Sequence, residues 1–237
     1  MSRAKQAIQA GRPVIAVNPG GVAFPVIDIL ARHGCDCLFV DCERTPISVE
    51  SVPVLARAAE ARGMSALVRS PSKDPAILTR YVDCGVDGLI LPQVESLEEC
   101  AMLVRTARYA TKGREAELLL VAQIESAPAV ARVDELAAAP GIDLFLIGPN
   151  DLAHSMGFLG DTSRPELRAA VDHAAERLQA AGKPFGLPVT PETASGWIAR
   201  GARLLYVTLD QLVAASLGEF RKAMSRPGPE PQPGRSA

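Results

Sequence analysis

Two carboxylates in the sequence stand where a predicted buried strand runs out into a loop. Glu125 closes the run Val121-Ala-Gln-Ile-Glu125, and Asp151 follows Leu146-Ile-Gly-Pro-Asn. Strand ends hold oxygen ligands rigidly, and two carboxylates without a complete protein cage suit Mg²⁺ or Mn²⁺, because such ions keep positions for water and substrate. Acidic residues are also common at helix N-termini, so both could instead cap the helices that follow. The pattern alone leaves both interpretations open.

The composition limits the class of protein. The chain has 237 residues, a length typical of one (β/α)8 barrel. Its 25 basic and 27 acidic residues form no basic stripe, and few aromatic residues are available to stack on bases. The N-terminus lacks the apolar segment of a signal peptide, and no uncharged run is long enough to span a membrane. We therefore expect a cytoplasmic protein that binds neither nucleic acid nor membrane.

The cysteines indicate a reducing compartment. They are five in number, which fits no complete set of disulfides. Cys35, Cys37 and Cys42 lack the spacing and the nearby histidine pair of a structural zinc site. We expect free thiols in strands or core.

Short apolar runs alternate with amphipathic stretches along the whole chain. The runs are rich in Val, Ile and Leu, which is typical of strands buried on both faces. They predict strands at 13–17, 37–41, 66–69, 88–91, 118–124, 144–147, 185–188 and 204–208. The stretches between them predict helices at 22–32, 49–61, 74–84, 97–109, 127–138, 164–181, 191–200 and 210–224. This strict alternation indicates an α/β protein with one domain, a (β/α)8 TIM barrel over residues 1–224.

Local signals support these boundaries. Glycine follows five of the predicted helices at the position that favours a left-handed backbone, at Gly34, Gly63, Gly85, Gly182 and Gly201. Thr190-Pro191 is typical of a helix start. An open dinucleotide-binding sheet is disfavoured, because Asn18-Pro-Gly-Gly21 does not match the glycine-rich phosphate loop. Residues 225–237 are rich in proline and glycine, and we expect disorder there.

In such a barrel the active site lies at the C-terminal ends of the strands. Polar and ionisable residues collect after the second to sixth predicted strands. They are Asp41, Glu43 and Arg44, then Arg69, Gln93, Gln123 and Glu125, and finally Asn150, Asp151 and His154. Asn18 and Thr208 are the polar candidates at the remaining strand ends.

Asp41 and Glu43 share one face of an extended backbone. Neighbouring carboxylates raise each other's pKa unless a cation balances their charge. Arg69 could provide that balance, and its planar fork also suits a carboxylate or a polarised oxygen of a substrate. An ion pair that only holds the loop is the alternative role for Arg69.

Together these motifs resemble one family. The segments Leu38-Phe-Val-Asp41-Cys-Glu43, Val68-Arg69, Leu91-Pro92, Gln123-Ile-Glu125 and Ile147-Gly-Pro-Asn-Asp151-Leu152 are similar in order and spacing to the HpcH/HpaI class II aldolases. The similarity extends from about residue 5 to about residue 224. It implies a metal-dependent lyase that makes or breaks an aldol bond between a pyruvate-like 2-oxoacid and an aldehyde.

The resemblance implies a role for each matching position. Glu125 and Asp151 correspond to the ligands of a divalent metal, Mg²⁺ or Mn²⁺, with Co²⁺ as a further candidate. Arg69 corresponds to the arginine that holds the keto oxygen of the substrate and stabilises the enolate. Asp41 and Glu43 correspond to the acids beside it.

The substrate would lie between the fifth and sixth strand ends. Gln123 corresponds to a glutamine that lines the metal site. Pro149 directly precedes Asn150 and Asp151, whose backbone N–H groups would receive the substrate carboxylate. The resemblance also implies a homo-oligomer, a trimer or hexamer that exchanges the C-terminal helix at 209–224.

One position departs from the family pattern. Arg44 stands where the family has a catalytic histidine, and an arginine does not deprotonate in proteins. Asp83 corresponds to the aspartate that pairs with that histidine, so an ion pair between Arg44 and Asp83 is expected. The proton acceptor would then be a metal-bound hydroxide, Glu43 or His154.

The remaining basic residues are expected to be structural. His33 and His173 fall inside predicted helices. Lys73 could approach the site, but none of the strands ends in the lysine that a Schiff-base aldolase needs.

Three functions remain open at this point. The first is the metal-dependent aldolase. The second is a Claisen-type, citrate-synthase-like condensing enzyme, in which Arg44 would bind an additional substrate carboxylate. The third is a non-catalytic protein that binds the metal and the 2-oxoacid.

Overall fold

The computed structural model describes residues 1–225, and they form a closed barrel of eight parallel strands. The tail predicted to be disordered lies outside the described residues from position 226 on. The strands are β1 (Val14–Asn18), β2 (Cys37–Asp41), β3 (Ser65–Arg69), β4 (Gly88–Leu91), β5 (Leu119–Ile124), β6 (Leu144–Ile147), β7 (Phe185–Pro188) and β8 (Ala202–Thr208). Each strand pairs with the next, and β8 pairs with β1. The predicted (β/α)8 barrel is confirmed, with strand ends shifted by two residues at most.

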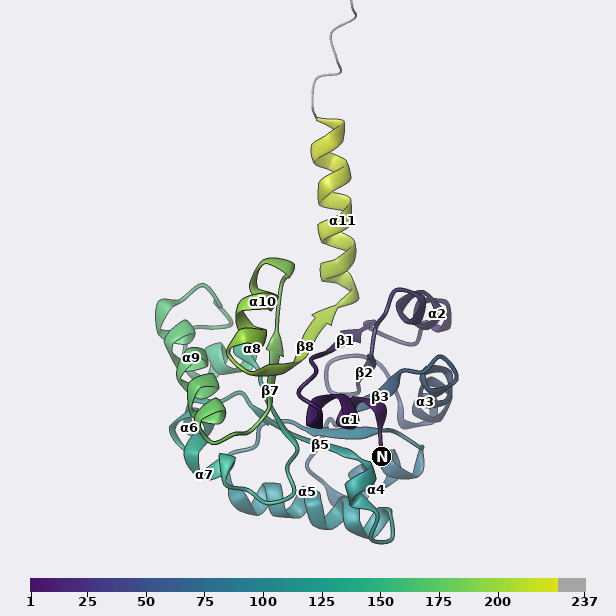
Figure 1. The fold of residues 1–237 in the computed structure, drawn as a ribbon, viewed down its shortest axis with the longest axis vertical. Coiled ribbons are helices and arrows are strands. Elements are labelled where there is room, and N and C mark those ends of the chain that lie inside the picture. The colour runs from purple at the N-terminus through teal and green to yellow at the C-terminus, as the bar shows by residue number, and fades with distance from the viewer. Residues whose placement is uncertain (226–237) are drawn as a thin grey trace, which may run out of the picture.

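Helices surround the barrel in the predicted alternation (Figure 1). They are α2 (Phe24–Arg32), α3 (Val52–Ala61), α4 (Pro75–Asp83), α5 (Leu97–Ala110), α6 (Ala127–Ala131), α7 (Val133–Ala137), α9 (Pro165–Ala180), α10 (Pro191–Ala199) and α11 (Leu209–Met224). Short 3-10 turns at Val49–Ser51 and Glu115–Glu117 precede α3 and β5. The helix predicted at 127–138 is divided in two at Arg132, whose backbone leaves the helical region at φ −109° and ψ 16°.

Two helices were not predicted from the sequence. α1 (Arg3–Gln9) lies across the ring of strands in Figure 1 and packs Ala4, Ala7 and Ile8 against the barrel interior. Lys5 fixes it there, because its Nζ lies 2.9 Å from Asp143 and donates to the carbonyl of Leu118 at 2.8 Å. α1 therefore closes the N-terminal end of the barrel. The second helix, α8 (Pro149–Ser155), follows β6 at the opposite end.

The strand alternation separates an inner core from an outer one. On β2, Phe39 belongs to the cluster inside the barrel, whereas Leu38 and Val40 pack against the helices. Two residues beyond Phe39, on the same face, is Asp41. By the same spacing of two residues, Arg69, Gln123 and Tyr206 lie on the same strand face as Leu67, Val121 and Leu204. The C-terminal end of the barrel therefore receives the polar side chains, while the interior below it is apolar.

The predicted glycine and capping signals at the helix ends are confirmed. The five glycines expected after helices all have positive φ, from 67° at Gly182 to 102° at Gly201. Thr190 forms a capping box at the start of α10. In residues 1–225, no helix combines the length and apolar character needed to cross a bilayer.

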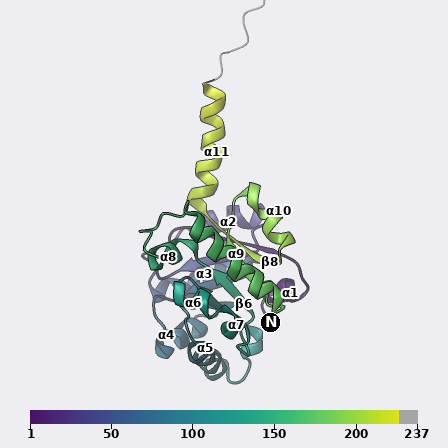
Figure 2. The same ribbon diagram turned by 90° about the vertical axis from the view of Figure 1, so that its left-hand side faces the viewer.

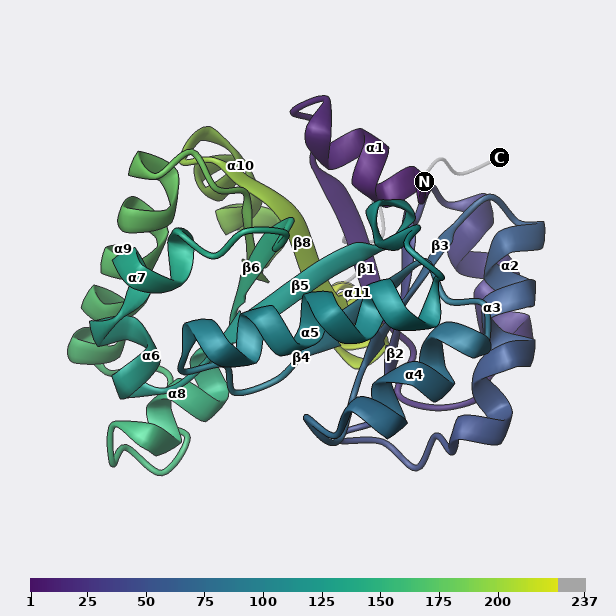
Figure 3. The ribbon, with the colours of Figure 1, turned by 90° about the horizontal axis from the view of Figure 1, so that it is seen from below.

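The last helix does not pack on its own barrel. α11 projects away from the strands in two perpendicular views (Figures 1 and 2), and it has no buried residue. Apolar side chains along it stay exposed, with Leu217 at 52% and Phe220 at 68%. An apolar groove near the base of α11, lined by Ile15 of β1 and by Leu205 and Val207 of β8, is left beside it. Seen from the other end, the remaining helices lie around the strands (Figure 3).

Candidate active site

A cavity of about 320 Å³ opens at the C-terminal end of the barrel. Much of its lining was predicted from the sequence, namely Arg44, Arg69, Gln123, Pro149, Asn150, Asp151 and His154. Phe39, Pro188 and Tyr206 also line it. Its size suits small ligands.

Arg69 is fixed by the two acids of the β2 segment. Its Nε donates to Oδ1 of Asp41 at 2.9 Å, and its Nη2 donates to Oδ2 at 2.6 Å. Nη1 lies 3.2 Å from Oε2 of Glu43, in an ion pair that is not aligned as a hydrogen bond. Burial raises the pKa of Glu43 above its ordinary value, although Arg69 opposes the shift. The guanidinium is therefore held in one orientation at the cavity wall.

Asp41 links several elements of the site. Oδ2 also accepts from Nδ2 of Asn18 at 3.1 Å, and that amide reaches Oη of Tyr206 at 3.0 Å. Oδ1 accepts from the backbone amides of Glu43 and Arg44, both at 3.2 Å. This carboxylate therefore orients Arg69 and at the same time shapes the loop after β2.

Glu125 is a buried carboxylate with 2% of its surface exposed. Oε2 accepts from Nε2 of Gln123 at 2.5 Å, and Oε1 accepts from the backbone amide of Gln93 at 2.8 Å. Burial raises the pKa of Glu125 to about 7, and the charges of Asp151 and Glu43 add to the shift. The carboxylate thus lies where its negative charge lacks a full counter-charge.

The loop after β4 directs a backbone amide at Glu125. Gln93 has a positive φ of 52°, which is uncommon for a residue other than glycine. Its carbonyl accepts from Nζ of Lys73 at 2.5 Å, and that ammonium also pairs with Glu99. Glu99 in turn forms a capping box with Ser96 at the start of α5. A contact chain therefore runs from α5 through Lys73 to the Gln93 amide.

Gly148 brings β6 and α8 close to Glu125. A Cβ at this glycine would lie 2.7 Å from Oε2 of Glu125 and 2.9 Å from Nε2 of Gln123. Its φ of −107° is open to any residue, so the requirement for glycine is one of space. No local pattern indicates this contact, because it joins segments that are distant in the chain.

Neither predicted carboxylate ligand caps a helix. Ser126 is the N-cap of α6 and Gly148 is the N-cap of α8. Asp151 lies in the first turn of α8 and lines the cavity. The capping interpretation of Glu125 and Asp151 is therefore wrong.

The expected ion pair between Arg44 and Asp83 is not formed within the chain. Nη2 of Arg44 donates instead to Oδ1 of Asp151. Asp83 is exposed at the C-terminal end of α4, which runs back toward the N-terminal ends of the strands. The two residues thus belong to opposite ends of the barrel.

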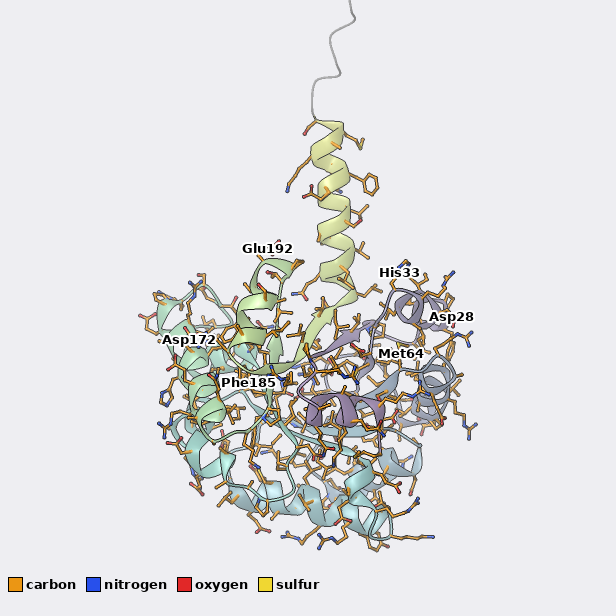
Figure 4. All side chains as sticks on the ribbon, in the orientation of Figure 1. Asp28, His33, Met64, Asp172, Phe185 and Glu192 are labelled. Carbon is orange, nitrogen blue, oxygen red and sulfur yellow. The ribbon has the colours of Figure 1, made fainter. Side chains whose placement is uncertain are left out.

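The remaining candidates are also placed by the structure. His154 lies in the last turn of α8 and lines the cavity. His33 follows α2 on the outside of the molecule (Figure 4), and His173 lies in α9. Thr208 caps α11, because its hydroxyl accepts from the amide of Gln211. All five cysteines are free thiols.

The donor set suits a metal that keeps much of its water. In the part of the chain that is described, no three His, Cys, Asp or Glu side chains are grouped so as to hold an ion. Glu125 and Asp151 offer two carboxylates, and Oε1 of Gln123 is a buried oxygen without a hydrogen-bond partner. A dication would offset the charge that burial penalises at Glu125. Mg²⁺-like ions bind with few protein ligands, so the residues fit such an ion.

Comparison with known proteins gives the family. The model of the HpcH/HpaI aldolase/citrate lyase family matches residues 21–214, a span that contains all the cavity residues named above. The chain belongs to this family. Its aldolase function, predicted from the sequence, agrees with the names of its relatives, and the protein is an aldolase-type carbon–carbon lyase.

The similarity to individual HpcH/HpaI relatives extends over most of the chain. The pyruvate aldolase of Rhizobium etli is 31% identical over 229 residues, covering 87% of this chain and 90% of the relative. The hydroxypyruvate/pyruvate aldolase of Deinococcus radiodurans is 31% identical over 257 residues, covering 97% and 93%. A solved HpcH/HpaI aldolase/citrate lyase family protein from Burkholderia cenocepacia has a TM-score of 0.84 at 26% identity, covering 95% of this chain and 100% of its own.

Proposed function

We propose that this protein forms or cleaves an aldol bond between a pyruvate-like 2-oxoacid and an aldehyde, with Mg²⁺ or Mn²⁺ held by Glu125 and Asp151. One observation carries the proposal. Glu125 is almost completely buried at the catalytic end of the barrel, and burial raises its pKa to about 7. Such a carboxylate needs a positive partner to stay charged at neutral pH. When bound, the ion would supply Lewis-acid polarisation of the keto oxygen.

Arg69 would stabilise the negative charge that develops on the same oxygen. Its guanidinium lines the cavity and is prevented from turning by two hydrogen bonds to Asp41. A cation already in position costs no reorganisation when the enolate forms, and such electrostatic stabilisation is usually the largest catalytic effect. Asp41 is thus a positioning residue, and Arg69 is the proposed catalytic one.

His154 is the proposed proton acceptor. It lines the cavity, whereas Glu43 is paired with Arg69 and is not part of the lining. In cleavage, His154 would accept the proton of the substrate hydroxyl as the carbon–carbon bond breaks. The bonding electron pair passes to the 2-oxoacid fragment as an enolate, and a proton then adds to its methylene carbon to give the methyl group. In synthesis the same steps run in reverse.

The proposal includes a homo-oligomer that exchanges α11. The helix buries none of its residues, and an apolar groove at β1 and β8 lies uncovered near its base. A second copy could cover that groove with its own α11. We expect Phe220→Asp, which places a charge on the exposed apolar face, to convert a trimer or hexamer into monomers in light scattering. A wild-type protein that is monomeric at micromolar concentration would refute the exchange.

A cytoplasmic location is part of the same proposal and rests on the five free thiols.

The reaction is tested with pyruvate, glycolaldehyde and Mn²⁺. We expect 4,5-dihydroxy-2-oxopentanoate to form, as detected by NMR, and we expect the product to be lost on adding a chelator or with Glu125→Gln. If no aldol product forms from pyruvate and any aldehyde acceptor with Mg²⁺, Mn²⁺ or Co²⁺, the proposal is wrong. Condensation with an acyl thioester in place of the aldehyde would instead support the Claisen-type alternative.

A further inference from the structure

The cavity contains two arginines whose hydrogen-bond donors are used very differently. Arg69 is 10% exposed in its side chain, and all three of its nitrogens face Asp41 or Glu43. Arg44 is 56% exposed, and only Nη2 is engaged, with Asp151. Within residues 1–225, Nε and Nη1 of Arg44 make no hydrogen bond. Arg44 is therefore the guanidinium of the cavity that keeps unused donors for a ligand.

The position of Arg44 is set by the same acid that holds Arg69. Oδ1 of Asp41 accepts from the backbone amide of Arg44 at 3.2 Å, and the Asp41 carbonyl accepts from the hydroxyl of Thr45 at 2.5 Å. The backbone of Arg44 is thus tied to the end of β2. Its side chain reaches across to α8 and stands further out than Arg69, which is almost buried.

The ion pair of Arg44 contributes little to the stability of the fold. Asp151 is its partner, and Pro149, Asn150 and Pro188 on the same cavity are uncharged. A partly exposed ion pair such as Arg44–Asp151 contributes little to folding, at most about 1 kcal/mol. A dication on Asp151 would also compete with Arg44 for that carboxylate, which leaves the guanidinium free to bind an anion in the cavity.

We infer that Arg44 binds a carboxylate carried by the aldehyde-side substrate, so that the preferred acceptor is an oxo-carboxylate such as glyoxylate. This inference rests on the proposed function. The Nη1–Nη2 edge of a guanidinium matches the two oxygens of a carboxylate. In Arg44 Nη1 is unused, and Nη2 has a second hydrogen besides the one that it donates to Asp151. A doubly charged phosphate fits less well, because Asp151 and Glu43 add negative charge near Arg44. Arg44 thus determines specificity for the second substrate, at a distance from the enolate that Arg69 stabilises.

The test compares two acceptors of equal length. Both are aldehydes with two carbons, and glyoxylate carries a carboxylate where glycolaldehyde carries a hydroxymethyl group. We expect wild-type protein with pyruvate and Mn²⁺ to have the higher kcat/KM for glyoxylate. Arg44→Met should lower the ratio of the two kcat/KM values about 10- to 100-fold, the effect of losing a charge-assisted hydrogen bond. Arg44→Lys keeps the charge but not the planar fork, so its ratio should lie between those of wild type and Arg44→Met. Arg57→Met, at an exposed arginine on α3, should leave the ratio unchanged.

A binding measurement gives the same information without turnover. 2-Oxoglutarate resembles the adduct of pyruvate and glyoxylate without its hydroxyl group, and 2-oxopentanoate lacks the second carboxylate. Calorimetry in Mn²⁺ should show tighter binding of 2-oxoglutarate to wild type, with the preference lost in Arg44→Met. This readout also serves if the variant is inactive but circular dichroism shows that it is folded.

The outcomes separate the two claims. Unchanged acceptor and ligand ratios in Arg44→Met would overturn the inference while leaving the aldolase intact. A higher kcat/KM for glycolaldehyde phosphate than for glyoxylate would overturn the choice of a carboxylate. If wild type forms no product with any acceptor, the proposed function itself fails, and the inference fails with it.

Discussion

The backbone amide of Gln93 donates a 2.8 Å hydrogen bond to Oε1 of Glu125, from a residue with a φ of 52°. A left-handed backbone at a residue other than glycine costs of order 1 kcal/mol or more and persists only where surrounding contacts enforce it. Besides the bond to Glu125, the amide of Val94 donates to the carbonyl of Gln123 at 3.0 Å, and the Lys73 ammonium donates to the Gln93 carbonyl. The proposed metal ligand is thus oriented by a loop that Lys73 holds in place.

Lys73→Met should weaken metal binding without unfolding the protein. The Gln93 carbonyl would lose its partner, and the amide would no longer be held toward Glu125. We expect the affinity for Mn²⁺, measured from the EPR signal of the free ion, to fall about tenfold, equal to about 1.4 kcal/mol. Lys112→Met, at an exposed lysine, is the matched control. Equal Mn²⁺ affinity in both variants would show that Lys73 has no role in orienting Glu125.

Gly148→Ala should disturb the site through space alone. The new Cβ would lie 2.7 Å from Oε2 of Glu125, so the carboxylate or the backbone must move. We expect aldolase activity to fall at least tenfold and the free energy of unfolding to fall by about 1–3 kcal/mol, the usual cost of overpacking. Gly196→Ala provides the comparison, because nothing lies within 4 Å of its Cβ position. Similar activities of the two alanine variants would contradict this reading of Gly148.

Metal-free protein should lose stability as the pH rises from about 4.5 to about 7. The pKa of Glu125 is about 7 in the folded state, against an ordinary value of 4.5. Between these values the folded state holds a proton that the unfolded state has lost, so the free energy of unfolding falls with increasing pH. Above pH 7 the cost is on the order of 3 kcal/mol.

Glu125→Gln should remove that dependence. In urea denaturation with chelator present, the variant should become more stable than wild type as the pH rises, and Mn²⁺ at pH 8 should stabilise wild type alone. Gln123 can turn its unpartnered Oε1 toward the new amide, which keeps the pocket hydrogen-bonded. Parallel pH profiles for the two proteins would mean that Glu125 is not the source of the effect.

Arg69→Lys should lower the rate of enolate formation about 100-fold while the protein stays folded. Lysine keeps the charge but cannot make the two parallel hydrogen bonds to Asp41 that fix the cation. The rate is measured as exchange of the pyruvate methyl protons. Arg105→Lys, in an exposed ion pair with Glu98, controls for the substitution itself. If Arg69→Lys exchanges as fast as this control, Arg69 has only the structural role of holding the loop.

The strands and most of the site could be predicted because they depend on local pattern. Buried runs mark the strands, and the period of two from Phe39 to Asp41 and from Val121 through Gln123 to Glu125 directs these side chains to one end of the barrel. Tyr206 follows from Leu204 by the same rule, although an isolated tyrosine in an apolar run gives little sign of a polar role.

Contacts between distant segments could not be predicted. Arg44 pairs with Asp151, 107 residues away, whereas the resemblance to the family implied Asp83. α1 has only seven residues and is held by tertiary contacts such as that of Lys5 with Asp143. The helical pattern of α11 was clear, yet periodicity does not tell which barrel an apolar face will cover.

The central claim is that Glu125, Asp151 and Arg69 form one centre that generates the enolate of a 2-oxoacid. The most direct measurement is proton NMR of pyruvate that has been incubated in D₂O with the protein and Mn²⁺ or Mg²⁺. Paramagnetic Mn²⁺ is removed before the spectrum is recorded. The methyl protons should exchange with solvent deuterium, and this exchange should stop with chelator and in Glu125→Gln. If pyruvate binds but its methyl protons do not exchange with Mg²⁺ or with Mn²⁺ present, the proposed enolate chemistry is contradicted. The protein would then bind the 2-oxoacid without activating it.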